Sequence, residues 1–292
     1  MNDTLQRFLF ERAGIRGEVV HLDATWREAL SRHDYPPAVR SLLGQMMASC
    51  LLLSATLKFE GSITMQIQGD GPINLMVVEA TAKRTLRGMA QWQSEVPEGD
   101  LHARFGSGRL VITIEAGGTT EAGLRYQGIV ELEGDSLADA LDAYLERSEQ
   151  LPTRMWLAAD DQRAAGLLLQ RLPGNGDEDE DAWERTGALA GTITDNELLT
   201  LDPQEVIRRL FHEEDLRLFD SEPVAFLCSC SEERVGAMLR SLGRDEVMDI
   251  VRTEGQVEIT CQFCNKRYLF DAVDAEQLFA SETTPPVTPT RH

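Results

Sequence analysis

The sequence predicts an α+β fold with an N-terminal domain of mixed sheet and helix, a helical linker, and a small C-terminal four-cysteine zinc domain. Alternating apolar and polar runs fill roughly the first 173 residues, a strongly acidic stretch interrupts them, and four of the five cysteines lie in two short stretches near the C-terminus. The boundaries we expect are residues 1–173 for the α+β domain, 174–223 for the linker, 224–280 for the cysteine-bearing domain, and 281–292 for a Pro/Thr-rich disordered tail.

The N-terminal part predicts antiparallel strands with short connections. Strand-like runs alternate in polarity and are separated by Gly and Pro, as in the turn "QGDGP". The expected strands are 17–22, 62–70, 73–80, 85–93, 109–116 and 124–132, followed by a closing hairpin of 153–160 and 163–173.

Two helices are expected in the same domain. The apolar segment 41–59 follows the helix start "DYPP" (34–37), and polar residues such as Gln45 and Ser49 interrupt it. These interruptions favour a buried core helix over a membrane span. Residues 135–152 form an amphipathic pattern that stops at Pro152.

The net charge of −21 restricts the classes of partner. A nucleic-acid-binding protein usually presents a basic face, whereas this charge would repel phosphates. The N-terminus lacks a basic region followed by a long apolar run, so no secretory signal is predicted. We therefore expect a cytoplasmic protein with reduced thiols that binds neither nucleic acid nor membrane.

The predicted linker is the most acidic part of the chain. Between residues 175 and 222 there are fifteen Asp and Glu against four Arg, a net charge of −11. The acidic run "DEDED" favours extended chain, because like charges repel one another. Beyond it, "TDNELLTL" and "DPQEVIRRLFHEED" predict short helices with apolar faces. Helices this short are marginal alone, so they must pack on another part of the protein or melt.

The cysteine pattern is the strongest chemical signal. Two closely spaced pairs, Cys228-x-Cys230 and Cys261-x-x-Cys264, are separated by thirty residues with two predicted helices. Two chelating pairs of thiolates suit one tetrahedral Zn²⁺ per chain. A domain of this size has a marginal core, so bound zinc, worth about 10–16 kcal/mol, would supply its folding free energy.

Three other interpretations of the four cysteines compete with a structural zinc site. A thioredoxin-like catalyst needs Cys-x-x-Cys at the start of a helix, whereas "NKRYLF" after Cys264 predicts a strand. A redox switch is chemically open, because oxidants attack thiolates and disulfide formation would eject the metal. Unliganded core cysteines are the remaining alternative. The fifth cysteine, Cys50, lies in the apolar helix and is expected to be a buried structural thiol.

These stretches resemble the thirty-three-kilodalton heat-shock protein family, the bacterial redox-regulated holdase chaperones. The similarity runs nearly end to end and is carried by "SATLKFEG", "QGDGP", "YQGIVELEGDSLADALDAYLERSEQLPTR", "AAGLLLQRLP", "FHEED", "FLCSCSEERV" and "CQFCNKRYLF". The two cysteine pairs are the most specific part of this resemblance, since they follow such an N-terminal region in that family.

The resemblance implies a function and a switch. The N-terminal domain would bind substrate, the linker would be metastable, and the reduced, inactive form would hold zinc through Cys228, Cys230, Cys261 and Cys264. On oxidation, Cys228 would pair with Cys230 and Cys261 with Cys264. Zinc would leave and the linker would unfold. The activated, ATP-independent holdase, often a homodimer, would bind unfolded or misfolded client proteins and prevent their aggregation under oxidative stress.

Two other function classes stay open from the sequence. A zinc-ribbon interaction module would bind nucleic acid or a protein partner, although the net charge disfavours nucleic acid. A thiol-disulfide oxidoreductase would use the cysteines catalytically. The five histidines form no metal or triad spacing, and no nucleotide-binding, nucleophile-elbow or metalloprotease motif is present. No residue is therefore predicted to be catalytic, and we expect a protein that is not an enzyme.

Overall fold

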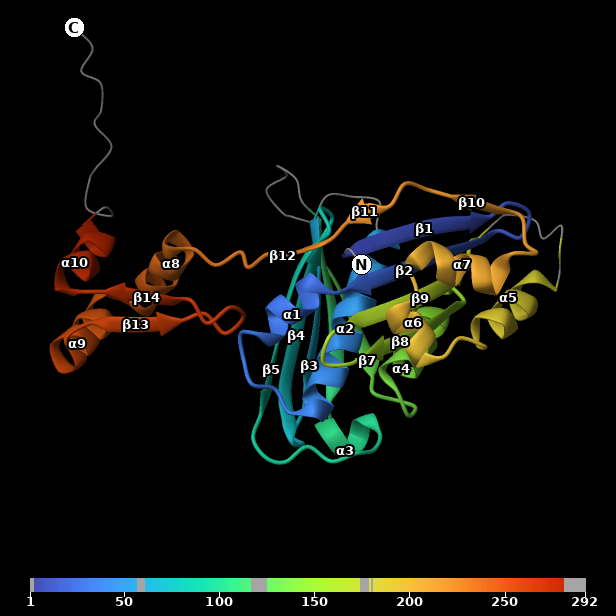
Figure 1. The fold of residues 1–292 in the computed structure, drawn as a ribbon. Helices are drawn as coiled ribbons and strands as arrows, with labels where there is room; N and C mark the ends of the chain where they lie inside the picture. Colours follow the sequence, from blue (N-terminus) through green and yellow to red (C-terminus); the bar gives the residue numbers. More distant parts are fainter. Residues whose placement is uncertain (1–2, 57–60, 117–124, 174–178, 180, 281–292) are drawn as a thin grey trace, which may run out of the picture. The chain divides into compact units, whose positions relative to one another are not determined.

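The computed structural model describes residues 3–56, 61–116, 125–173, 179 and 181–280 (Figure 1). Contacts divide the chain into two compact units, Met1–Leu227 and Cys228–His292. Each unit combines helices with antiparallel strands, so the predicted α+β class is confirmed. The predicted tail 281–292 and three of the five residues in the acidic run 177–181 lie outside the described residues.

The first unit contains two six-stranded sheets. In sheet A the order is β10 (Leu216–Leu218), β1 (Thr4–Phe10), β2 (Ile15–Leu22), β9 (Ala164–Arg171) and β8 (Thr153–Ala159), with β11 (Glu222–Pro223) also on β1. In sheet B it is β12 (Ala225–Phe226), β5 (Thr85–Trp92), β4 (Ile73–Thr81), β3 (Gly61–Gln68), β6 (Arg109–Ala116) and β7 (Arg125–Glu131). All pairings are antiparallel except that of β12 with β5.

Helix α2 (Pro37–Thr56) lies between the two sheets and packs against strands of both (Figure 1). Its length and composition would allow it to cross a membrane, but 78% of its most apolar window is buried inside the protein. Most of its residues are inaccessible because its apolar side chains extend all round the helix. The predicted core helix is therefore confirmed from Pro37 to Thr56, and the expected residues 57–59 lie outside the described residues.

Three further helices complete this core. They are α1 (Ala24–Leu30), α3 (Leu101–Phe105) and α4 (Leu137–Ser148). A capping box starts α4, because the Ser136 hydroxyl accepts the Asp139 N–H and the Asp139 carboxylate accepts the Ser136 N–H. The turn "QGDGP" joins β3 to β4, as predicted, and the Gly71 N–H donates to the Phe105 carbonyl at 3.0 Å.

The outer face of sheet A is covered by α5 (Ala182–Ala190), α6 (Asp195–Thr200) and α7 (Pro203–Phe211) (Figure 1). The last two are the helices predicted in the linker, and the Asp202 carboxylate caps α7 with Pro203 at its first position. The segment after α7 has no predicted element. It forms β10, β11 and β12, which are too short to give a sequence pattern.

The second unit contains a hairpin and three helices. The elements are α8 (Glu232–Leu242), α9 (Arg244–Glu254), β13 (Val257–Thr260), β14 (Arg267–Phe270) and α10 (Ala272–Ala280). Gly243 and Gly255 follow α8 and α9 with φ of 95° and 84°, a region that favours glycine. The buried apolar core of the unit is small and consists of Leu239, Val247, Val251, Val257, Tyr268, Phe270 and Ala275.

Candidate metal centre and linker

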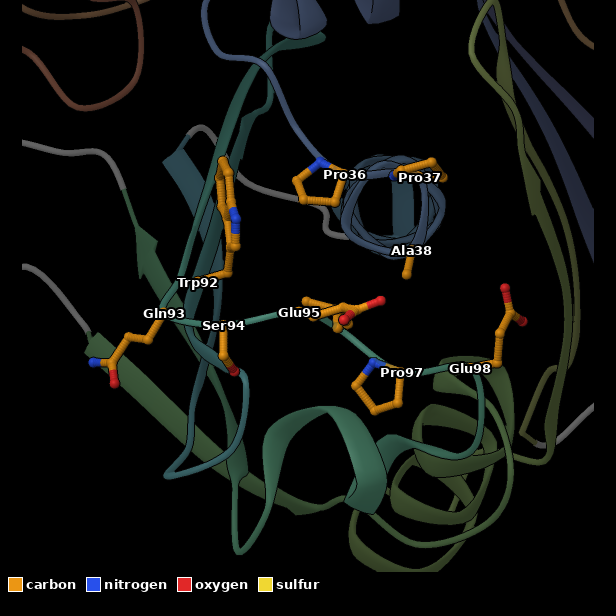
Figure 2. Close-up of a pocket in the computed structure, with 10 residues that line it drawn as sticks. Pro36, Pro37, Ala38, Trp92, Gln93, Ser94, Glu95, Pro97 and Glu98 are labelled. Carbon is orange, nitrogen blue, oxygen red and sulfur yellow. The ribbon is translucent and has the colours of Figure 1, made fainter.

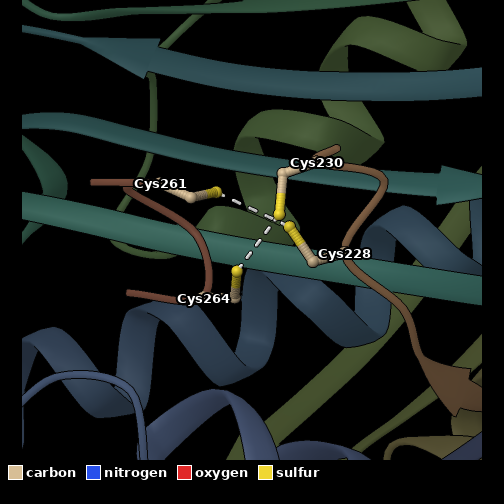
Figure 3. Close-up of side chains that lie close together, drawn as sticks. All are labelled: Cys228, Cys230, Cys261 and Cys264. Atoms are coloured by element: carbon tan, nitrogen blue, oxygen red, sulfur yellow. Dashed lines mark hydrogen bonds between the residues drawn. The ribbon is translucent and has the colours of Figure 1, made fainter. Parts of the chain in front are cut away.

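Four thiols meet in the second unit, as Figure 3 shows. The Sγ atoms of Cys228, Cys230, Cys261 and Cys264 all lie within 4.8 Å of one another. The Cys230–Cys264 and Cys228–Cys261 sulfur pairs are 3.4 Å and 3.7 Å apart. Thiolates at a Zn–S distance of about 2.3 Å would lie roughly 3.8 Å apart at the corners of a tetrahedron. The four residues predicted from the sequence are thus brought together in an arrangement that could hold a metal ion.

The Cys-x-x-Cys pair lies in the turn between β13 and β14. The Cys261 N–H donates to the Lys266 carbonyl at 2.9 Å, and the Asn265 N–H donates to the Cys261 carbonyl at 2.8 Å. Asn265 has a φ of 55°, which Asn tolerates better than most residues. A strand follows Cys264, so this pair does not start a helix as a thioredoxin-like site requires.

The Cys-x-Cys pair lies in irregular chain just before α8. The Ser231 hydroxyl caps this helix by accepting the Arg234 N–H at 3.2 Å. The Arg234 guanidinium donates to the Ser229 carbonyl at 3.1 Å and to the Ser229 hydroxyl at 2.8 Å. Arg234 therefore holds the backbone between the two cysteines, a role that its position in the sequence does not reveal.

The thiols differ in acidity. Burial raises the pKa of Cys264 to about 12, and its contact with Cys230 adds to this shift. For Cys230, burial acts against ionisation, but the nearby Tyr268 hydroxyl and the other thiols outweigh it and lower the pKa to about 7. The same contact raises the pKa of Tyr268. Cys230 therefore forms a thiolate more readily than Cys264, and the thiolate is the form that binds metals and reacts with oxidants.

Tyr268 was not singled out from the sequence. It faces the thiols only because of the register of the hairpin, in which Ile259 lies opposite it. The Lys266 ammonium lies 4.9 Å from the centre of the Tyr268 ring, within the range of a cation–π interaction. A sequence pattern could have shown that Tyr268 is on a strand but not what its hydroxyl meets.

Cys50 is far less reactive than this cluster. It is completely buried in α2, and burial raises its pKa far above the ordinary value. Its thiol lies 3.7 Å from the Ile63 carbonyl. This agrees with the predicted structural thiol.

The linker helices bury an apolar face against sheet A. The Phe211 ring centre lies 5.7 Å from that of Phe8 and 5.1 Å from that of Phe10. Gly17 lies beneath Phe8, and a Cβ there would come within 2.0 Å of the ring. The buried residues of α5, α6 and α7 in this cluster are Ala182, Ala190, Leu198, Leu199, Val206, Ile207, Leu210 and Phe211.

Polar contacts also connect the linker helices to sheet A. The Leu199 carbonyl lies 2.7 Å from Nε2 of the buried His21, on β2. The Arg154 guanidinium of β8 pairs with Glu184 at 2.9 Å and lies 5.0 Å from the centre of the Trp183 ring. Most of the acidic side chains of this region stay exposed, so the helices combine an apolar inner face with a charged outer one.

A pocket of about 590 Å³ lies in the first unit at the start of α2, as Figure 2 shows. Its walls combine the indole of Trp92 with prolines and two exposed carboxylates, Glu95 and Glu98. No cysteine lines it, so it is separate from the thiol cluster.

Comparison with known proteins agrees with this architecture. The family model described as Hsp33 protein matches residues 3–271. A 33 kDa chaperonin of Nitrosococcus oceani is 52% identical over 290 residues, covering 99% of each chain. One from Methylobacillus flagellatus is 47% identical, covering 100% of this chain and 99% of its own.

A solved structure shares the fold. The crystal structure of the 33 kDa chaperonin (heat shock protein 33 homolog) of Thermotoga maritima superimposes with a TM-score of 0.82 at 23% identity, covering 96% of this chain and 99% of that one. Fold, cysteine cluster and full-length similarity lead to one conclusion. The chain belongs to the Hsp33 family of chaperones.

Proposed function

We propose that this chain is a redox-regulated, ATP-independent holdase that binds unfolding proteins and prevents their aggregation under oxidative stress. The observation that carries the proposal is the convergence of four thiols within 4.8 Å, at residues that directly follow the segment packed on sheet A. The reduced form, with zinc bound, is inactive. Oxidation of the thiols removes the ligands, the second unit loses its fold, and the linker helices leave sheet A.

The redox step needs a two-electron oxidant for each pair of thiols. Each disulfide forms when two zinc-bound thiolates lose two electrons, and one peroxide molecule that takes up these electrons and two protons from solvent becomes two waters. Two disulfides therefore consume two peroxide molecules and leave no thiolate for the metal. The test is to measure zinc release and client aggregation before and after peroxide with mild heat. Zinc loss without suppression of aggregation would contradict the proposal.

Reduced protein is expected to bind one Zn²⁺ per chain, and the four-fold Cys→Ser variant of the cluster is expected to bind none. Zinc prefers thiolates in tetrahedral sites, and a serine hydroxyl does not replace them. Elemental analysis of the purified proteins measures this directly. Cys50→Ala is the matched control and should keep its zinc, because Cys50 lies in the other unit. Near-full zinc in the four-fold variant would contradict the assignment.

Oxidised protein is expected to contain the disulfides Cys228–Cys230 and Cys261–Cys264. In the folded state the shortest sulfur contacts join different pairs, Cys228 with Cys261 and Cys230 with Cys264. Once the unit unfolds, however, chain entropy favours closure of the shortest loops. Peptide mapping of oxidised protein distinguishes the two patterns. If the mapping found mainly the disulfides Cys228–Cys261 and Cys230–Cys264, the expected pairing would be contradicted, and the disulfides would form before the fold is lost.

Neutralising the acidic run is expected to make activation harder. Replacing Asp177, Glu178, Asp179, Glu180 and Asp181 with Asn or Gln removes like-charge repulsion that favours extended chain. Zinc release should then proceed as before, while holdase activity develops severalfold more slowly. The matched control neutralises five exposed carboxylates elsewhere in the first unit, at Glu95, Glu98, Asp135, Glu146 and Asp161. Equal slowing in both variants would assign the effect to net charge alone.

Unfolded client proteins are the partners in this proposal, with a homodimer formed on activation. The net charge of −21 disfavours nucleic acid and an anionic membrane surface as partners. Salt-dependent retention on DNA would favour the zinc-ribbon alternative instead. Turnover in an insulin-reduction assay would favour a thiol oxidoreductase.

A further inference from the structure

One segment covers an edge of both large sheets. We call residues 216–227 the strap; in Figure 1 it is the orange trace that runs along β1. Its strands β10 and β11 pair with β1, and β12 pairs with β5. Without the strap, β1 and β5 would be the outermost strands on these sides of sheets A and B. An open strand edge presents unpaired N–H and C=O groups that can pair with another chain.

The main chain of the strap is bonded to the edges of both sheets. Besides the ladder bonds of β10 and β11, N–H groups of the strap donate to the sheet edges from Phe219 to the Arg7 carbonyl (3.0 Å), Val224 to that of Asp3 (3.0 Å), Ala225 to that of Arg84 (3.1 Å) and Leu227 to that of Leu86 (3.1 Å). Such bonds do not depend on side-chain identity, so a different polypeptide could make them equally well.

Side-chain burial in the strap is concentrated at two positions, while other apolar side chains stay largely exposed. Leu218, Phe219 and Leu227 remain 47%, 41% and 58% exposed. Val224 is buried in the central core and Phe226 packs against that core. The strap thus resembles a short extended peptide with apolar side chains at two alternate positions, seated in the edge of sheet B.

A charged contact connects the middle of the strap to both edges. The Glu222 carboxylate accepts a hydrogen bond from the Arg84 guanidinium at 2.7 Å and forms an ion pair with the Arg7 guanidinium at 2.6 Å. Arg7 lies on β1, and Arg84 lies in the turn before β5. The strap ends at Leu227, and the next residue is Cys228. Loss of the fold around Cys228 would therefore free the chain end that β12 needs for its pairing.

We propose that the strap is a removable edge strand, and that in the activated protein the uncovered edge of β5 binds an extended segment of an unfolded client by strand addition. Two alternate apolar residues of the client segment occupy the positions that Val224 and Phe226 leave. The client main chain makes the hydrogen bonds to β5 that the N–H groups of Ala225 and Leu227 make in the reduced protein. This inference rests on the proposed holdase function. It accounts for promiscuous binding, because every unfolded chain carries the same main-chain groups.

A peptide with the sequence of residues 219–227, FDSEPVAFL, tests the proposal. The fluorescein-labelled peptide should bind the peroxide-activated full-length protein at least tenfold more tightly than the reduced protein, whose edge is occupied. A second peptide carries an N-methyl group at the position of Ala225, which removes one donor to β5. The matched control is N-methylated at the position of Phe226, whose N–H points away from β5 because its neighbours Ala225 and Leu227 donate to it.

The expected result is at least tenfold weaker binding for the peptide methylated at Ala225, and binding within about threefold of the unmodified peptide for the control. The unmodified peptide should also displace thermally unfolded citrate synthase from the activated protein. Equal binding of both methylated peptides, or no peptide binding, would overturn strand addition. Conversion of a dimer to monomers without release of client would assign the edge to a second copy and also overturn it.

Light scattering of the same oxidised samples distinguishes failure of the proposed holdase function from failure of strand addition at β5. Failure to suppress citrate synthase aggregation would remove the holdase function itself, and the client inference with it. Suppression of aggregation together with insensitivity to N-methylation would leave the holdase intact and refute only strand addition at β5.

Discussion

Phe211→Asp is expected to give holdase activity without any oxidant. The Phe211 side chain is almost completely buried between α7 and the rings of Phe8 and Phe10. Loss of such a buried ring costs about 3–5 kcal/mol, and an unpaired carboxylate in its place adds a desolvation penalty. The linker helices depend on this face, because they are too short to persist alone. They should therefore leave sheet A while zinc stays bound.

Suppression of client aggregation by reduced protein, measured together with zinc content, checks this expectation. The matched control is Gln204→Asp, which adds the same charge to an exposed position of the same helix and should leave the protein inactive. Circular dichroism of both variants shows whether the sheets are kept. A Phe211→Asp protein that retains its sheets, releases the linker helices and still fails to bind clients would refute the proposed gating.

Removal of zinc is expected to unfold the second unit completely. Among the described residues of that unit, the buried apolar cluster has seven members, a small core for a domain of this size. Binding of a structural zinc is worth about 10–16 kcal/mol, so its loss exceeds any stability that the apolar core supplies. The four-fold Cys→Ser variant should show the same unfolding without oxidant, and it should be active as a holdase.

Nuclear magnetic resonance of the full-length protein measures this effect residue by residue. The amide signals of α8, α9 and α10 should collapse to positions typical of unfolded chain, whereas those of α2 and β3 should remain dispersed. Cys50→Ala is the control, since it removes a thiol without touching the cluster and should leave α8 to α10 folded. Persistence of the three helices in the zinc-free variant would show that zinc is not what holds the unit together.

Local patterns were sufficient to predict most of the fold. The alternation in 62–70 and 109–116 predicted β3 and β6, and Pro37 marked the start of α2. The cysteine spacing predicted the cluster for a related reason, because the two thiols of each pair are only two or three residues apart in the sequence. The close approach of the two pairs to each other depends on the fold of the residues between them, which the sequence could not show.

Features that depend on distant partners were not predicted. β1 was missed because Leu5, Phe8, Leu9 and Phe10 give a short run without clear alternation, and its identity comes from pairing with β2. The strap strands are two or three residues long and form only against β1 and β5. The positions of Tyr268 and Arg234 around the thiols likewise follow from register and capping, which no spacing in the sequence encodes.

Hydrogen exchange of the linker helices during oxidation tests the central claim most directly. Release of α5 to α7 from sheet A requires that their amides, protected in reduced protein, exchange rapidly once the thiols are oxidised. The account predicts that protection across 182–211 is lost in step with zinc release and the rise of holdase activity, while amides of α2 stay protected. Unchanged protection of 182–211 in fully active, oxidised protein would contradict it.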